Sequence, residues 1–340
     1  MKKMKIIMGL LFALILLLAG MILFLLKKQD TPPESRETEK QSTQWSADFL
    51  KKGRVTAIDY SGQVYGYTGS KKDAGEKIAE YGRKQREKYD NPGVKEIEKQ
   101  MEDEFGIFAV NLGEMDEETA KDVKRAFSYM YETYPCLQGT LTNVTLGNPD
   151  NYADGNIAKT ESREFVINGE LAVCPFVVKH EIVLYAPSFL QRDTRLKKCK
   201  DGAKQGYWPE NMDISAIVVH ELGHQVLNVH TMEEFGFDDI YYITEENQDA
   251  YNLYLTDSLS SRQTVPKVVL KEAYKTWEQT HQGEDYESFC RSISEYALAV
   301  QKDGGISYTE TFAEAITDVY LNQEHAADAS KCIQGMCSAW

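Results

Sequence analysis

The chain has 340 residues, 42 % of them hydrophobic, and a formal net charge of −15. This length allows one large domain, or one domain with a small companion, around a sizeable core. The acidic balance argues against nucleic acid or an anionic lipid surface as the main partner, because both require basic patches.

The first predicted element is a helix over residues 6–26, an apolar run of 21 residues flanked by lysines. At ~1.5 Å per residue, this run matches the ~30 Å hydrocarbon core of a bilayer. We therefore predict a single-pass membrane anchor over residues 1–28, with the rest of the chain outside the cell. A cleaved signal peptide is the alternative, and it would also export the chain.

Residues 29–46 are polar and rich in charge, which is typical of a disordered stalk. Residues 47–108 form an accessory segment in this interpretation. Its pattern predicts a hairpin over 54–67, around Ser61-Gly62, and a charged helical stretch over 72–104 that is interrupted at Pro92-Gly93.

The catalytic domain is placed at residues 109–340. An amphipathic helix is predicted over 117–134, and strands over 140–146, 164–172 and 182–185, with Asn168-Gly169 as a turn in the second. From Asp213 to Tyr320 the periodicity is helical again. A small sheet followed by helices predicts an α+β fold.

Six cysteines follow the apolar run, and an oxidising exterior would permit disulfides between them. We predict disulfide bonding, with Cys332 and Cys337 as the local pair, although buried free thiols are the alternative. The cysteines are Cys136, Cys174, Cys199, Cys290, Cys332 and Cys337.

The strongest chemical signal is His220-Glu221-Leu222-Gly223-His224, an HExxH motif. On a helix, its two histidines lie one turn apart on one face and can bind one cation, while Glu221 is placed as general base. Two imidazoles and one further protein ligand leave a fourth position for water on a catalytic zinc ion. The motif therefore predicts a zinc metallopeptidase.

Three residues are candidates for the third ligand: His230, Glu310 and Glu314. His230 has the spacing of the metzincin motif, but Leu227 stands where that motif needs a glycine, and no methionine follows Met232 before Met336. Glu310 and Glu314 recur with Asp318 at every fourth position, so one helix face carries three acids. Such a row suits one carboxylate on a metal and a second that orients an imidazole.

The chain resembles the metallopeptidases related to anthrax lethal factor and to the clostridial Pro-Pro endopeptidases. The resemblance rests on the HExxH motif, on Ser294-Glu295-Tyr296-Ala297, and on Glu310-Thr311-Phe312-Ala313-Glu314. It implies a zincin-like fold in which His220, His224 and Glu310 bind Zn²⁺ and Glu314 supports them.

The same resemblance implies that Tyr296 is the active-site tyrosine, which can donate a hydrogen bond to an oxyanion. The spacer between Tyr296 and Glu310 is longer than in the family, which leaves Tyr308 as a rival. The resemblance also implies that a substrate adds as a strand to a sheet edge, for which residues 182–185 are suited.

The sequence thus predicts an extracellular, membrane-anchored zinc metalloendopeptidase whose partners are peptide or protein substrates. Two alternatives stay open: a metzincin-type peptidase with His230 as third ligand, and a zinc-binding surface module without turnover.

Overall fold

A computed structural model describes residues 55–58, 64–67, 71–147, 157–163, 166–167, 170–171, 176–177, 179–236, 242–258, 263–300, 305–337 and 340. Its centre is a four-stranded mixed sheet in the order β3, β4, β9, β5. The first three strands are parallel, and β5 is antiparallel to β9. The strands are β3 (Ala109–Asn111), β4 (Asn143–Gly147), β9 (Lys179–Tyr185) and β5 (Ala158–Arg163).

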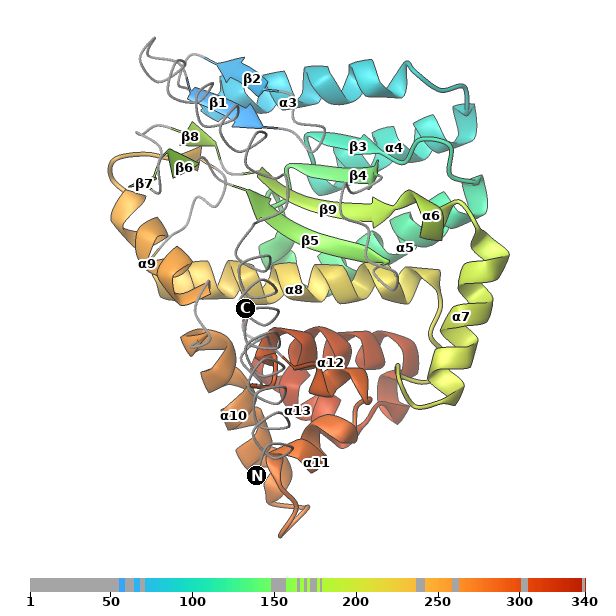
Figure 1. The fold of residues 1–340 in the computed structure, drawn as a ribbon, viewed down its shortest axis with the longest axis vertical. Coiled ribbons are helices and arrows are strands. Elements are labelled where there is room, and N and C mark those ends of the chain that lie inside the picture. Colours follow the sequence, from blue (N-terminus) through green and yellow to red (C-terminus); the bar gives the residue numbers. More distant parts are fainter. Residues whose placement is uncertain are drawn as a thin grey trace, which may run out of the picture.

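Helices surround this sheet and continue beyond it, which confirms the predicted α+β class. Figure 1 shows α8 lying along the β5 side of the sheet, with α12 on the opposite side of α8. The helices are α3 (Lys71–Arg86), α4 (Pro92–Phe105), α5 (Glu117–Thr133), α6 (Ala186–Phe189), α7 (Arg192–Lys204), α8 (Ile214–Glu234), α9 (Gln248–Ser258), α10 (Thr264–Glu278), α11 (Tyr286–Arg291), α12 (Tyr308–Asn322) and α13 (Asp328–Cys337).

Helix α5 follows the predicted amphipathic pattern. Asp116 caps its first turn by accepting a hydrogen bond from the Thr119 amide at 2.8 Å. Its apolar face is buried, with Phe127 and Met130 inaccessible to solvent. Helix α4 packs on α5 and β3, so part of the predicted accessory segment shares the core of the sheet.

Helix α8 is buried on all sides because it lies between the sheet, α5 and α12. Its N-terminus is capped by Asp213, which accepts a hydrogen bond from the Ala216 amide at 2.8 Å. At Gly223, a Cβ atom would lie 3.1 Å from the Cα of Ala313 in α12. A glycine there lets the two helices approach closely, which matters because both carry the candidate site.

The small strands agree only in part with the predicted ones. The hairpin of β1 (Val55–Ile58) and β2 (Val64–Tyr67) and the pair β6 (Val166–Ile167) and β7 (Glu170–Leu171) lie where predicted. Two further strands, β8 (Phe176–Val177) and β10 (Tyr242–Ile243), also pair with each other. The short strand β3 and the edge strand β5 were not predicted.

The prediction that residues 182–185 form a sheet edge is wrong. They belong to β9, which pairs with β4 on one side and with β5 on the other. Both rows of backbone hydrogen-bonding groups are therefore engaged, and the side chains of Ile182, Val183 and Leu184 are fully buried. Within the described sheet, β5 is the edge nearest to α8.

The predicted membrane anchor and extracellular location need correction. A membrane-spanning helix needs about 20 mainly apolar residues. Across the described residues, no helix has both the length and the apolar character to cross a bilayer. The predicted anchor at 1–28 and the stalk at 29–46 lie outside the described residues.

The prediction of disulfide bonds is also contradicted. Among the described cysteines, all five are free thiols, and Cys174 lies outside the described residues. Cys332 and Cys337 both lie on α13, where five residues at 100° each turn their side chains ~140° apart. Cys337 instead donates its thiol to the Ile333 carbonyl at 3.3 Å.

Candidate metal centre and its cleft

Three side chains from two helices converge on one point. Helix α8 places His220 and His224 one turn apart, with their Nε2 atoms separated by 3.1 Å. Helix α12 brings Glu310 to them, its Oε2 lying 3.2 Å from Nε2 of His220 and 3.5 Å from Nε2 of His224. In the described part of the chain, these three residues form the cluster suited to hold a metal ion.

The spacing of these three atoms fits zinc. Tetrahedral zinc with ligand bonds of 2.0–2.1 Å has neighbouring ligand atoms about 3.3 Å apart. The three separations of 3.1, 3.2 and 3.5 Å lie around that value. Two imidazoles and one carboxylate are also a donor set that zinc accepts. The residues present therefore fit the metal that the sequence predicts.

Glu314 fixes the orientation of the first imidazole. Its Oε1 lies 2.9 Å from Nδ1 of His220, so Nδ1 carries a proton and Nε2 is the ring atom left to face Glu310 and a metal ion. The other oxygen of Glu314 accepts a hydrogen bond from the Ser294 hydroxyl at 2.6 Å. Glu314 is 1 % exposed, so this pair of contacts lies away from solvent.

The electrostatics of the cluster are those of a site built for a cation. Burial of the His220 ring acts to lower its pKa, but the hydrogen bonds and charges of Glu310 and Glu314 outweigh burial and raise the pKa well above its ordinary value. Burial acts to raise the pKa of Glu310, yet the two imidazoles hold that pKa far below its usual range. The carboxylate is thus ionised beside both rings.

The third acid of the α12 row, Asp318, serves the scaffold. Its carboxylate accepts hydrogen bonds from the Ala327 amide at 2.8 Å and from the Ser330 hydroxyl at 2.6 Å, both at the start of α13. A further bond comes from the Asn322 side chain at 2.7 Å. The predicted row of acids therefore divides between the metal cluster, its support and the helix that follows.

His230 lies outside the cluster. Helix α8 continues without a break through Leu227, which carries the His230 ring away from the other two imidazoles. The ring stacks on Trp340 with centroids 3.7 Å apart, and its Nε2 lies 4.0 Å from Glu234.

Glu221 and Tyr296 lie beside the cluster. Glu221 is buried and lines the same cleft as His220. The backbone amide of Tyr296 donates to the Tyr207 carbonyl at 3.0 Å, and its ring centroid lies 5.8 Å from that of His220. Burial, together with the charge of Glu310, raises the pKa of the Tyr296 phenol. The phenol thus keeps its proton at neutral pH and can donate a hydrogen bond.

Tyr308 does not reach the cleft. It lies in the first turn of α12, with its ring against that of Tyr286 at a centroid distance of 6.1 Å. Of the two candidate tyrosines, the structure brings Tyr296 beside His220.

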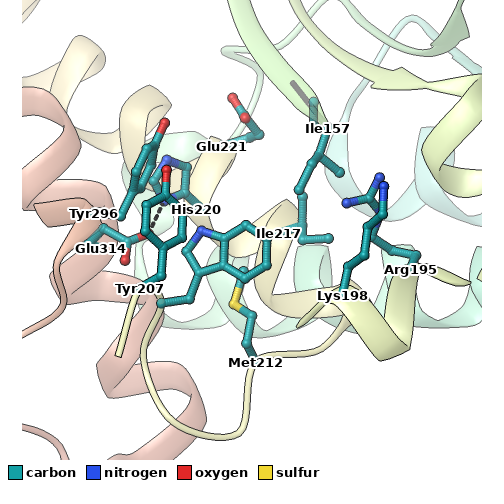
Figure 2. A pocket seen from close by; sticks show the side chains of 12 residues that line it. Ile157, Arg195, Lys198, Tyr207, Met212, Ile217, His220, Glu221, Tyr296 and Glu314 are labelled. Atoms are coloured by element: carbon teal, nitrogen blue, oxygen red, sulfur yellow. Dashed lines mark ion pairs between the residues drawn. The ribbon is translucent and has the colours of Figure 1, made fainter. Parts of the chain in front are cut away.

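A cleft of about 450 Å³ opens from the cluster between α7, α8, β5 and the loop after α7. Figure 2 shows Tyr207 and Tyr296 beside His220 at one end, and Arg195 and Lys198 at the other. Four of the residues that line the cleft were not predicted from the sequence: Tyr207, Trp208, Arg195 and Lys198. The signals that could have found them are the aromatic pair just before the HExxH helix and the basic run that precedes it.

Comparisons of the chain with protein-family models, with curated proteins and with solved structures found no match.

Proposed function

We propose that the chain is a zinc metalloendopeptidase that hydrolyses peptide bonds. The observation that carries this proposal is the convergence of His220, His224 and Glu310 beside a cleft that His220 and Glu221 line. A structural zinc site takes four protein ligands, whereas a catalytic site takes three and keeps an open position. The described cluster supplies three.

The proposed roles follow from the positions of the side chains. When bound, zinc would supply the Lewis acidity that activates water and polarises a carbonyl. Glu221 would accept a proton from the attacking water on a carboxylate oxygen and pass it to the leaving amine. Tyr296 would donate its phenolic hydrogen to the oxyanion that forms on the substrate carbonyl. Glu314 would hold Nδ1 of His220, which keeps Nε2 directed at the metal.

The proposed class is a glutamate-ligated peptidase similar to the lethal factor and Pro-Pro endopeptidase group. Two observations favour it over a metzincin. Glu310 lies within 3.5 Å of both imidazoles, and His230 is engaged with Trp340 instead. The Ser294 and Tyr296 elements of the resemblance also lie next to Glu314 and His220.

The ligand set is tested by measuring zinc stoichiometry in Glu310→Ala and His230→Ala. Both changes remove one candidate ligand, and we expect zinc to be lost from the first protein and retained in the second. Zinc retained in Glu310→Ala and lost from His230→Ala would overturn the assignment.

Turnover is tested with a peptide library and the change Glu221→Gln, which removes the base but not the metal ligands. The matched control is Glu233→Gln, an exposed glutamate on the same helix. We expect cleavage by the zinc-loaded wild-type chain and the control, and a loss of at least ~10²-fold in Glu221→Gln. Full zinc occupancy with no cleavage by the wild-type chain would instead indicate a binding module without turnover.

A further inference from the structure

The far end of the cleft has a charge opposite to that of the molecule. The chain carries a net charge of −15, but α7 has six basic and two acidic residues within its thirteen. Arg195 and Lys198 lie one turn apart on this helix and line the cleft. The acidic residues among the described lining are Glu221 and Glu314, both at the metal end.

The two basic side chains are held apart from those acids. Figure 2 shows Arg195 and Lys198 projecting from α7 on one side, Glu314 and Tyr296 on the other, and Ile157 between them. A substrate lying along the cleft from the metal ligands would pass apolar side chains before it met the cations. Along the cleft, the charge of the lining side chains therefore changes from negative near His220 to positive at α7.

Packing holds the basic wall of the cleft, formed by Arg195 and Lys198 of α7, in place. Arg195 is 6 % exposed, and its Nη2 donates to the Ser188 hydroxyl. A Cβ atom at Gly202, in the last turn of α7, would lie 2.5 Å from the Trp208 ring, so helix and aromatic loop are in contact. An immobilised cation beside apolar walls acts more strongly on a ligand than the same charge in open solvent.

We propose that Arg195 and Lys198 form a specificity subsite for a carboxylate group of the substrate. The preferred peptide then carries an acidic side chain, or its C-terminal carboxylate, at a fixed distance to one side of the cleaved bond. Arginine and lysine recognise carboxylates through charge-assisted hydrogen bonds. This inference rests on the proposed peptidase function, whose substrate class it specifies.

The experiment uses the full chain loaded with zinc and a peptide that it cleaves in the library. A single Asp is moved through the positions on both sides of the cleaved bond, with the Asn peptide as its neutral partner at each position. Peptides that end soon after the cleaved bond are made with a free or an amidated C-terminus. These two arms distinguish an acidic side chain from a terminal carboxylate.

The variant Lys198→Glu reverses the charge at the subsite, and Lys200→Glu is the matched control. Both lysines are exposed on α7, but they lie ~200° apart around the helix, and Lys200 does not line the cleft. We expect a gain in kcat/KM of roughly tenfold for the carboxylate peptide at one position, lost in Lys198→Glu and kept in the control. The gain should also shrink as salt is added, because salt screens exposed charges.

The outcomes separate the two proposals. Equal rates for every Asp and Asn pair and for both C-terminal forms, or equal loss in Lys198→Glu and Lys200→Glu, would overturn the subsite and leave the peptidase intact. No cleavage of any library peptide would overturn the peptidase itself, and the subsite with it.

Discussion

Replacing Glu314 with alanine should loosen zinc without touching a ligand atom. The Glu314 side chain is 1 % exposed, and its Oε1 lies 2.9 Å from Nδ1 of His220. Its Oε2 accepts a hydrogen bond from the Ser294 hydroxyl. Its loss leaves the Nδ1 proton without that acceptor, so the ring can rotate or change tautomer and Nε2 no longer points steadily at the metal. Loss of such a support costs 10–100-fold in metal affinity, or about 1.4–2.7 kcal/mol.

The assay is a competition titration of zinc against a chromophoric chelator, with the melting temperature recorded in parallel in excess chelator. Asp318→Ala is the matched control, because Asp318 is buried on the same face of α12 but bonds to Ala327 and Ser330. It should lower the stability by about 1–3 kcal/mol and leave zinc affinity within about twofold. If folded Glu314→Ala binds zinc as tightly as the wild-type chain, or if both variants loosen zinc equally, the reasoning is refuted.

Three further results are expected. Zinc at 100 times its Kd should stabilise the chain by about 2.7 kcal/mol, so chelation should lower the melting temperature, and an unchanged value would count against binding by the folded state. Gly223→Val should lower the free energy of unfolding, measured in urea, by about 1–3 kcal/mol, because the added Cβ would lie 3.1 Å from the Cα of Ala313. A variant as stable as the wild-type chain would show that α8 and α12 can move apart to make room. Iodoacetamide should modify Cys332 at least roughly tenfold faster than Cys290, because Cys290 is buried and burial raises its pKa to about 11. Equal rates of alkylation of the two cysteines, followed by mass spectrometry, would contradict the burial of Cys290.

The helices of this fold could be predicted from the sequence because helical periodicity is local. The face of α5 that holds Phe127 is buried as its spacing indicates. The helical stretch predicted over 72–104 is interrupted, as expected, but the break lies between α3 and α4, and Pro92 is the first residue of α4. The sheet was harder, because strand order depends on contacts far apart in the chain. Residues 182–185 were correctly predicted to form a strand, but the position of this strand in the sheet was predicted wrongly. Their apolar character suits a central strand as well as an edge strand, and β9 is a central strand.

In the candidate site too, local contacts could be predicted from the sequence and long-range contacts could not. The spacing of His220 and His224 predicts their proximity, because one helix turn sets it. Tyr296 reaches His220 through a backbone hydrogen bond to Tyr207, a contact between segments 89 residues apart that no local pattern contains. The basic wall of the cleft was missed for a related reason. A run of lysines on a helix is usually a solvated face, and only the tertiary fold turns Lys198 toward the cleft.

The acids of α12 show how one local pattern acquires three roles. Glu310, Glu314 and Asp318 are four residues apart, so each lies one turn further along the same face. Glu310 contacts both imidazoles, and Glu314 contacts Nδ1 of His220. Asp318 accepts hydrogen bonds from residues at the start of α13. The roles differ because α12 crosses α8 near the close contact at Gly223, and each turn of α12 therefore faces a different neighbour. The geometry of the three candidate metal ligands thus depends on how closely these two helices pack.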